Sequence, residues 1–163
     1  MICARCRRRA GHGERQLCSK CQGHIVGRTA LRELYRSRGR IILDDSSPGS
    51  SMLKHLVSLH PDLQKKFRFA RVPTARAILP WCLEDCAAAY LKALFIGKKF
   101  RNCPMPLAKI TRRECGDYCR HSGLKFKRLR DSSQDILRFI SDVEARRAGS
   151  KFALAKIIVK ANV

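Results

Sequence analysis

Residues 40–60 read RIILDDSSPGSSMLKHLVSLH, and this stretch decides the class of fold. The apolar run at residues 40–43 is bounded by turn signals, which is typical of a buried strand in a parallel sheet. A loop of small and acidic residues follows at 44–51, and apolar residues at helical spacing from Met52 onward predict a helix that Pro61 stops. A strand, a small-residue loop and a helix in this order offer backbone N–H groups and a helix N-terminus to an anion.

The pattern downstream of this stretch continues the alternation of strands and helices. Partial alternation predicts a second strand at residues 66–72, and residues 77–79 are a candidate third strand. Helices are expected at residues 81–96 before Gly97, at 111–121 with a capping box of Thr111 and Glu114 before Gly123, and from 132 to Gly149. The segment 152–159 fits either a strand or a helix. This alternation predicts an α/β domain with a parallel sheet.

The N-terminal end carries two CxxC pairs, Cys3 with Cys6 and Cys18 with Cys21. A CxxC turn directs two thiolates toward one tetrahedral centre, and a second pair closes the coordination shell with no open position for a substrate. The spacing therefore predicts a structural zinc site with these four cysteines as ligands.

Reduced free thiols and a redox pair are the alternatives to a metal site. Free thiols need no such regular pairing, and a redox motif normally has one CxxC at the start of a helix in a βαβ unit. A zinc ion bound by four thiolates carries a formal charge of about −2, and nearby cations favour the ligating thiolate form. The cations around the cysteines are Arg5, Arg7, Arg8, Arg9 and Lys20.

The chain is strongly basic for its length. Its 163 residues carry 35 Lys and Arg against 13 Asp and Glu, a formal net charge of +22. Charge of this density opposes compaction unless an anionic partner is near, and phosphate neutralisation makes nucleic acid the expected partner. Hydrophobic residues make up 45% of the chain, which argues against a disordered basic tail. Because no apolar run reaches the roughly 20 residues of a spanning helix, we expect no membrane partner.

A basic stripe lies on the first helix, which the apolar spacing places at residues 24–38, ending at Gly39. Arg28, Arg32 and Arg36 repeat every four residues on a face other than the apolar one. A plain solvated face is the alternative reading. The overall charge and the adjacent cysteine pairs favour contact with nucleic acid.

The number and the pairing of the cysteines indicate the cellular compartment of the protein. Nine cysteines in a secreted chain would suggest disulfides, but the N-terminus lacks the apolar segment of a secretory signal. An odd count with CxxC pairing suits a reducing compartment. A mitochondrial presequence would be removed where the metal-binding pairs begin, at Cys3. We therefore expect a cytosolic, cytoplasmic protein.

Taken in order, these elements resemble the cytoplasmic tRNA 2-thiolation protein 2 family, the partner subunit of the enzyme that places sulfur on the wobble uridine of certain tRNAs. Four segments that together span most of the chain carry the resemblance. They are the CxxC pairs with the basic helix at 3–38, the strand, loop and helix at 41–59, the run Pro106-Leu107, Ile110-Thr111, Glu114 and Tyr118-Cys119, and Lys127-Arg128-Leu129 before the helix at 136–139.

The resemblance implies a non-catalytic subunit of the complex that 2-thiolates U34 of cytosolic tRNAs. Its partners would be tRNA and an ATP-using catalytic subunit, and the sulfur would come from a ubiquitin-like carrier. The residues expected to contact tRNA are Arg5, Arg7, Arg8, Arg9, Arg28, Arg32 and Arg36. The expected organisation is a zinc module with its basic helix at residues 1–38 and, at 39–163, a reduced Rossmann-like domain with a pyrophosphatase-type loop.

That loop departs from the family's SGGxDS pattern, and the chain is shorter than family members usually are. The degenerate loop comprises Asp45, Ser46, Ser47, Gly49, Ser50 and Ser51, without the paired glycines. Pro48 removes an N–H donor that a phosphate cradle would use, and Asp44 with Asp45 would repel a triphosphate unless magnesium intervened. The sequence therefore argues against ATP binding, which suits a supporting subunit.

The other polar candidates are weaker. Cys82, Cys86, Cys103, Cys115 and Cys119 could form a second metal or iron–sulfur site, but no CxxC recurs among them and we expect them to pack as small apolar residues. His12 and His24 flank the CxxC pairs, which already supply four ligands. Glu114 suits a capping role better than that of a general base, and no set of nucleophile, base and acid is visible.

Two other classes of function remain open. One is a basic zinc-ribbon protein of the ribosome or of RNA processing, without a thiolation partner. The other is an active ATP-dependent enzyme of the same superfamily, which would bind ATP through Ser50 or Ser51.

Overall fold

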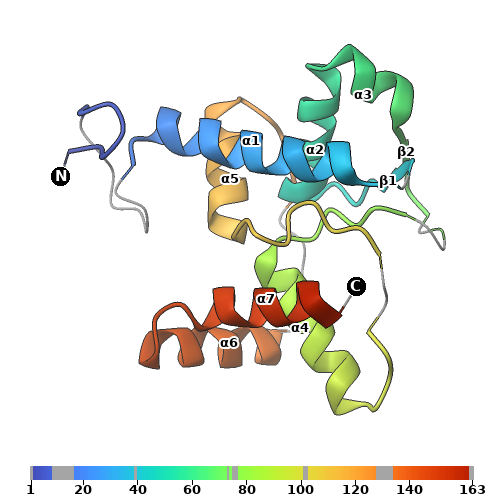
Figure 1. Cartoon of the computed structure of the whole chain (residues 1–163), viewed down its shortest axis with the longest axis vertical. Helices are drawn as coiled ribbons and strands as arrows, with labels where there is room; N and C mark the ends of the chain where they lie inside the picture. Colours follow the sequence, from blue (N-terminus) through green and yellow to red (C-terminus); the bar gives the residue numbers. More distant parts are fainter. Residues whose placement is uncertain are drawn as a thin grey trace.

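The computed structural model describes residues 2–8, 17–38, 40–72, 74, 77–100, 103–127 and 134–161. Within these ranges the chain forms seven helices and two short parallel strands (Figure 1). An α/β chain with a small parallel sheet is what the sequence predicted. No helix in the described ranges is both long enough and apolar enough to cross a membrane.

The sheet centres on β1 (Ile41–Leu43), whose middle residue Ile42 is fully buried. On one edge it pairs in parallel with β2 (Arg68–Ala70), with Ile42 opposite Phe69. On the other edge, the Ile78 N–H donates to the Ile41 carbonyl at 2.7 Å, and the Leu43 N–H donates to the Ile78 carbonyl at 3.0 Å. Both predicted strands are confirmed, and the candidate strand at 77–79 is a single parallel bridge at Ile78.

Prolines begin two of the helices. The helix α2 (Pro48–Ser58) starts four residues before the predicted apolar run, because Ser47 caps it and Pro48 occupies its first turn, where a missing N–H has little cost. Pro61 ends the preceding turn and also opens the short helix α3 (Pro61–Lys66), which the sequence analysis did not predict.

The main hydrophobic core lies between α1 (Ser19–Arg36), α2, α5 (Arg112–His121) and the sheet. The first helix begins earlier than the predicted residue 24, and Cys18 is its N-cap. Close packing of α1 on α5 depends on Gly27, where an added Cβ would lie 3.3 Å from the Tyr118 ring. The predicted capping box is confirmed: the Thr111 N–H donates to Glu114 Oε2 at 3.0 Å, and the Glu114 N–H to Thr111 Oγ1 at 3.1 Å.

A second, smaller core forms where α6 (Gln134–Arg146) and α7 (Ser150–Ala161) pack beside α4 (Leu83–Phe95). The turn between α6 and α7 contains Gly149 in a left-handed conformation, with φ of +89°. The segment 152–159, which fitted either a strand or a helix, is helical and belongs to α7. Its packing against α4 and α6 favours the helix, whereas periodicity alone could not distinguish the two states (Figure 1).

Candidate functional site

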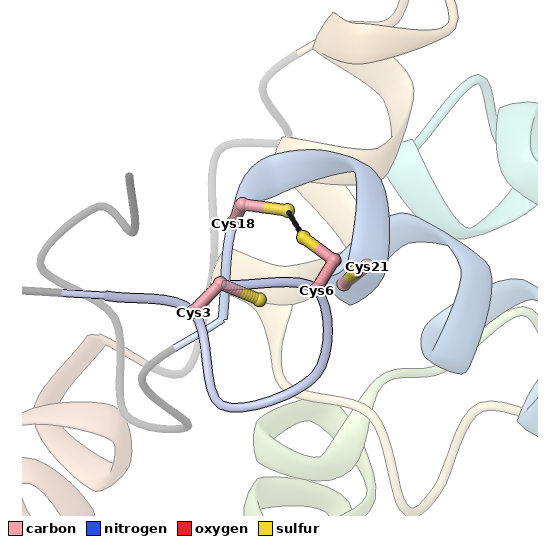
Figure 2. Close-up of side chains that lie close together, drawn as sticks. All are labelled: Cys3, Cys6, Cys18 and Cys21. Atoms are coloured by element: carbon pink, nitrogen blue, oxygen red, sulfur yellow. Dashed lines mark hydrogen bonds between the residues drawn. The ribbon is translucent and has the colours of Figure 1, made fainter. Parts of the chain in front are cut away.

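The four cysteines of the two CxxC pairs come together at the N-terminal end of α1 (Figure 2). Cys3 and Cys6 lie on a loop, Cys18 is the N-cap of α1, and Cys21 lies in its first turn. Their four sulfur atoms all lie within 4.8 Å of one another, and the Cys6 and Cys18 sulfurs are 3.5 Å apart. This group can hold a metal ion, and the four residues are those that the spacing indicated.

Backbone hydrogen bonds shape the loop that presents the first pair. The Cys3 N–H donates to the Arg8 carbonyl at 2.7 Å, and the Arg7 N–H donates to the Cys3 carbonyl at 3.0 Å. Arg7 adopts a left-handed conformation with φ of +58°, which folds the chain back toward Cys3. Cys3 is 1% exposed, whereas Cys6 faces solvent. The cluster is thus half embedded, with one open side.

The thiols of the cluster differ in acidity. The backbone N–H of Cys18 lowers the pKa of the Cys3 thiol to about 6, and that of Cys21 lowers the pKa of the Cys18 thiol. Desolvation, reinforced by the neighbouring thiols, raises the pKa of Cys21 to about 12. At neutral pH the cluster therefore holds thiolate at Cys3 but resists ionising all its sulfurs. A bound cation supplies the charge that stabilises four thiolates together.

Basic side chains surround the cluster. Arg5, Arg7, Arg8 and Lys20 are exposed, and Arg9 lies outside the described residues. The Arg5 Nη1 lies 3.2 Å from Nδ1 of His24, so this histidine contacts an arginine beside the sulfurs. These cations offset the negative charge that a four-thiolate metal centre would carry.

The arginine side chains of the basic stripe face solvent, as their spacing predicted. Arg28, Arg32 and Arg36 are all exposed along α1. Glu33 is their acidic neighbour: its Oε1 lies 3.9 Å from Arg32 and from Arg36 and accepts a hydrogen bond from Lys109 at 3.0 Å. One carboxylate is thus shared among several cations, so the stripe keeps a net positive charge. Its contact with RNA stays a prediction.

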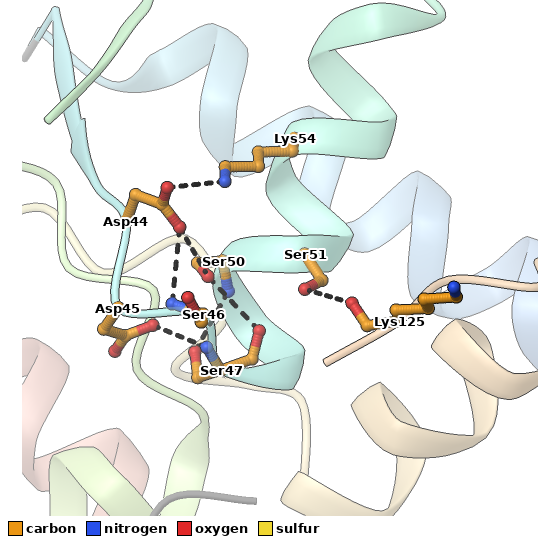
Figure 3. A network of polar contacts seen from close by, with 8 residues as sticks. All are labelled: Asp44, Asp45, Ser46, Ser47, Ser50, Ser51, Lys54 and Lys125. Carbon is orange, nitrogen blue, oxygen red and sulfur yellow. Dashed lines mark hydrogen bonds and ion pairs between the residues drawn. The ribbon is translucent and has the colours of Figure 1, made fainter. Parts of the chain in front are cut away.

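The loop after β1 hydrogen-bonds to its own side chains (Figure 3). The Ser46 N–H donates to Asp44 Oδ1 at 3.3 Å, and the Ser47 N–H to Asp45 Oδ1 at 2.9 Å. The Ser50 N–H donates to the Ser47 hydroxyl at 3.1 Å. A bond with Lys54, whose Nζ is 2.5 Å from Oδ2, lowers the pKa of the Asp44 carboxyl below its usual range. Three amides that a phosphate would need therefore already have acceptors, two of them carboxylates.

The hydroxyls and the glycine of this loop are also engaged. Ser50 Oγ donates to the Ser47 carbonyl at 3.2 Å, and Ser51 Oγ donates to the Lys125 carbonyl at 3.1 Å. A Cβ on Gly49 would lie 1.9 Å from the carbonyl oxygen of Pro80. Gly49 thus serves close backbone packing of the loop onto the segment before α4.

A hollow of about 540 Å³ opens beside the loop, between α2 and α5. Three arginines of α5 line it, Arg112, Arg113 and Arg120. The Arg112 guanidinium pairs with Asp85, and Arg120 Nη2 lies 2.5 Å from Asp117 Oδ1. An anion entering this hollow would compete with these carboxylates.

The remaining cysteines are buried. Cys82, Cys115 and Cys119 belong to the main core and Cys86 to the second core. The Cys115 sulfur lies 3.6 Å from that of Met52, and burial raises the pKa of the Cys86 thiol well above its ordinary value. Among the described residues, the N-terminal cysteines are the one group of three or more potential ligands whose ligand atoms all lie within 4.8 Å of one another. In the core, hydrogen bonds with the thiols of Cys119 and Cys82 raise the pKa of the Cys115 thiol.

The sequence analysis missed one set of basic residues. Lys65, Lys66 and Arg68, from α3 and β2, line a hollow together with Arg36 at the end of α1. They lie about thirty positions further along the chain than Arg36, so periodicity gave no sign of this grouping. The unpredicted helix α3 brings them there.

No protein-family model matches the sequence, and no curated protein sequence matches it. Among solved structures, the chain is similar to the U34-tRNA thiolase NcsA from Methanococcus maripaludis with its 4Fe-4S cluster. The TM-score is 0.74, and the match covers 98% of this chain and 86% of that chain at 11% sequence identity. The two proteins share a fold over nearly the whole of this chain.

Proposed function

We propose that this chain is a non-catalytic, tRNA-binding subunit in the 2-thiolation of the wobble uridine of cytosolic tRNAs. The observation that carries the proposal is the shared fold with a U34-tRNA thiolase over 98% of the chain. The net charge of +22 and the exposed arginine stripe support a role in binding RNA. The role in wobble-uridine thiolation is also what the resemblance of the motifs implies.

The conformation of the loop after β1 supports the non-catalytic part of this proposal. In a phosphate-binding loop, backbone N–H groups point at the ligand. Here the Ser46 and Ser47 amides donate to the carboxylates of Asp44 and Asp45, which would repel a polyphosphate. A partner subunit would then bind ATP and activate the uridine, taking sulfur from a ubiquitin-like carrier.

The metal in the proposal is a single structural zinc ion held by Cys3, Cys6, Cys18 and Cys21. A tetrahedral site with Zn–S bonds of about 2.3 Å places its sulfurs about 3.8 Å apart. The observed Cys6–Cys18 separation of 3.5 Å and the 4.8 Å limit for all four sulfurs fit one ion. A multinuclear cluster would hold its ligands further apart, since several metal ions lie between them. The zinc would fix the N-terminal loop to α1, because four protein ligands leave no position for a substrate.

The test is the 2-thiouridine content of bulk tRNA from cells depleted of this protein. We expect a clear loss at the wobble position, restored by the wild-type chain and not by the Cys18→Ser variant. Unchanged thiolation would reject the proposal. It would favour the other RNA-binding class, a basic zinc-ribbon protein of the ribosome or of RNA processing.

A further inference from the structure

A basic groove lies at the end of the sheet opposite the loop after β1. It has a volume of about 810 Å³ and is lined by six cationic side chains and one carboxylate, Asp62. The cations are Arg36, Arg38, Arg40, Lys65, Lys66 and Arg68. Because Arg40 precedes β1 and Arg68 begins β2, the groove lies at the amino ends of both strands. Ligands of α/β sheets bind outside the carboxyl ends, so this groove is separate from the usual ligand position of the fold.

The groove is preformed. Lys66 Nζ donates to the Tyr35 carbonyl at 3.1 Å, which ties the end of α3 to the end of α1. Arg68 Nη1 donates to the carbonyls of Gln64 and Phe67 at 2.9 and 3.2 Å, which orients its guanidinium. Within the described part of the chain, no ion pair joins Arg38, Arg40 or Lys65 to a carboxylate. Their charges are therefore available to a ligand that carries several negative charges.

An aromatic ring lies among these cations. Tyr35 lines the groove and is 51% exposed, so its ring is open to contact with a ligand that enters the groove. Cations that follow a phosphate backbone, together with an exposed ring for a base, are the parts of a single-stranded nucleic-acid site. A hollow of this volume has the size of a small-molecule pocket and admits a few nucleotides rather than a duplex.

We infer that this groove binds an unpaired segment of RNA, with phosphates against Arg38, Arg40 and Lys65 and a base stacked on Tyr35. The inference rests on the proposed function in taking RNA as the partner. It adds a second contact surface, continuous with the arginine stripe through Arg36.

The test measures binding of the zinc-loaded full-length chain to a labelled 12-nucleotide oligouridine at several salt concentrations. The groove variant is Arg38→Gln/Arg40→Gln/Lys65→Gln. The control, Lys92→Gln/Lys98→Gln/Lys99→Gln, removes the same charge from exposed lysines at the end of α4 and just beyond it. We expect the groove variant to lose more than tenfold in affinity and its log–log salt slope to become shallower by about two, at roughly 0.7 per phosphate contact. The control should change less than about threefold.

The Tyr35→Leu variant separates stacking from charge. It should weaken oligouridine binding about five- to tenfold and leave the salt slope unchanged, because the ring carries no charge. Thermal melts show whether each variant is folded, and all the substituted side chains are exposed.

Three outcomes would overturn the inference: no binding of oligouridine by the wild-type chain, equal losses in the groove variant and the control, or tighter binding of a 12-base-pair RNA duplex. In the first case, groove-dependent binding of phosphatidylserine vesicles would identify a membrane surface as the ligand instead. The proposed function is judged separately by tRNA thiolation in cells. Intact thiolation in cells that carry a groove variant without oligouridine binding would support the groove as an RNA-binding site. It would also show that tRNA thiolation does not depend on this groove.

Discussion

The sulfur of Cys6 lies 3.5 Å from the sulfur of Cys18, although the two residues are twelve positions apart and belong to different structural elements. Cys6 lies on an exposed loop, whereas Cys18 caps a helix that the core holds firmly through Val26, Ala30 and Leu34. The two sides of the cluster therefore differ in rigidity. A metal ion would bind the loop to a helix that is already positioned.

Cys18→Ser should abolish tight metal binding, because the serine hydroxyl is a poor substitute for a thiolate ligand. Metal content should fall from about one ion per chain to less than a tenth, and the melting temperature should drop as the metal's contribution to folding is lost. Elemental analysis of the purified protein with a thermal melt checks both, and it also distinguishes zinc from iron.

Cys86→Ala is the matched control for that substitution. Cys86 is buried outside the cluster, so its truncation should cost about 1 kcal/mol of stability through a small cavity and leave the metal in place. Equal metal loss in the two variants would mean that the N-terminal cysteines are not the ligands.

Metal affinity should fall as the pH falls. Protons compete with the metal for the thiolates, and below pH 6 even the Cys3 thiol, whose pKa the Cys18 N–H lowers to about 6, becomes protonated. The apparent affinity for zinc, measured against a chelator between pH 8 and pH 5, should therefore decrease throughout and most steeply below pH 6. An affinity that is constant over this range would argue against thiolate coordination.

Two glycine substitutions should act in opposite directions. Gly49→Ala should destabilise the fold by about 3 kcal/mol, because its Cβ would overlap the Pro80 carbonyl oxygen and backbone must shift. Gly116→Ala lies within α5, where the nearest atom to an added Cβ is a flexible Arg120 nitrogen at 3.5 Å. It should stabilise by up to about 1 kcal/mol through helix propensity.

Chemical denaturation of both variants provides the measurement. A Gly49→Ala protein as stable as the wild type would show that the loop after β1 does not pack on the segment before α4 as described.

Local signals were enough to predict much of this structure. The strand at 41–43, the capping box of Thr111 and Glu114 and the four convergent cysteines each depend on residues a few positions apart or on ligand spacing. The start of α1 was placed too late, because Cys18 lacks the usual capping side chain. The domain boundary expected between residues 38 and 39 stays a prediction.

Features that depend on distant segments were not predictable. The helical state of residues 152–159 depends on packing against α4. The basic groove depends on α3, which begins 25 positions beyond the end of α1. Periodicity within one segment contains no information about either arrangement. The pairing of the Ser46 and Ser47 amides with the aspartates needed the loop's actual conformation, in which Ser46 has φ of +59°.

Arg32→Ala should weaken tRNA binding without affecting the fold. Arg32 is exposed on α1, and its ion pair with Glu33 is long, at 3.9 Å, so the substitution should change stability by less than about 0.5 kcal/mol. Loss of one phosphate contact should make the log–log salt dependence of binding shallower by about one unit. Lys92→Ala, at an exposed position of α4, removes the same charge away from the stripe and should leave the slope unchanged. If Arg32→Ala unfolds the protein, or if both variants lose binding equally, the stripe is not the docking face. The tRNA would then have to be held by other cations of the chain.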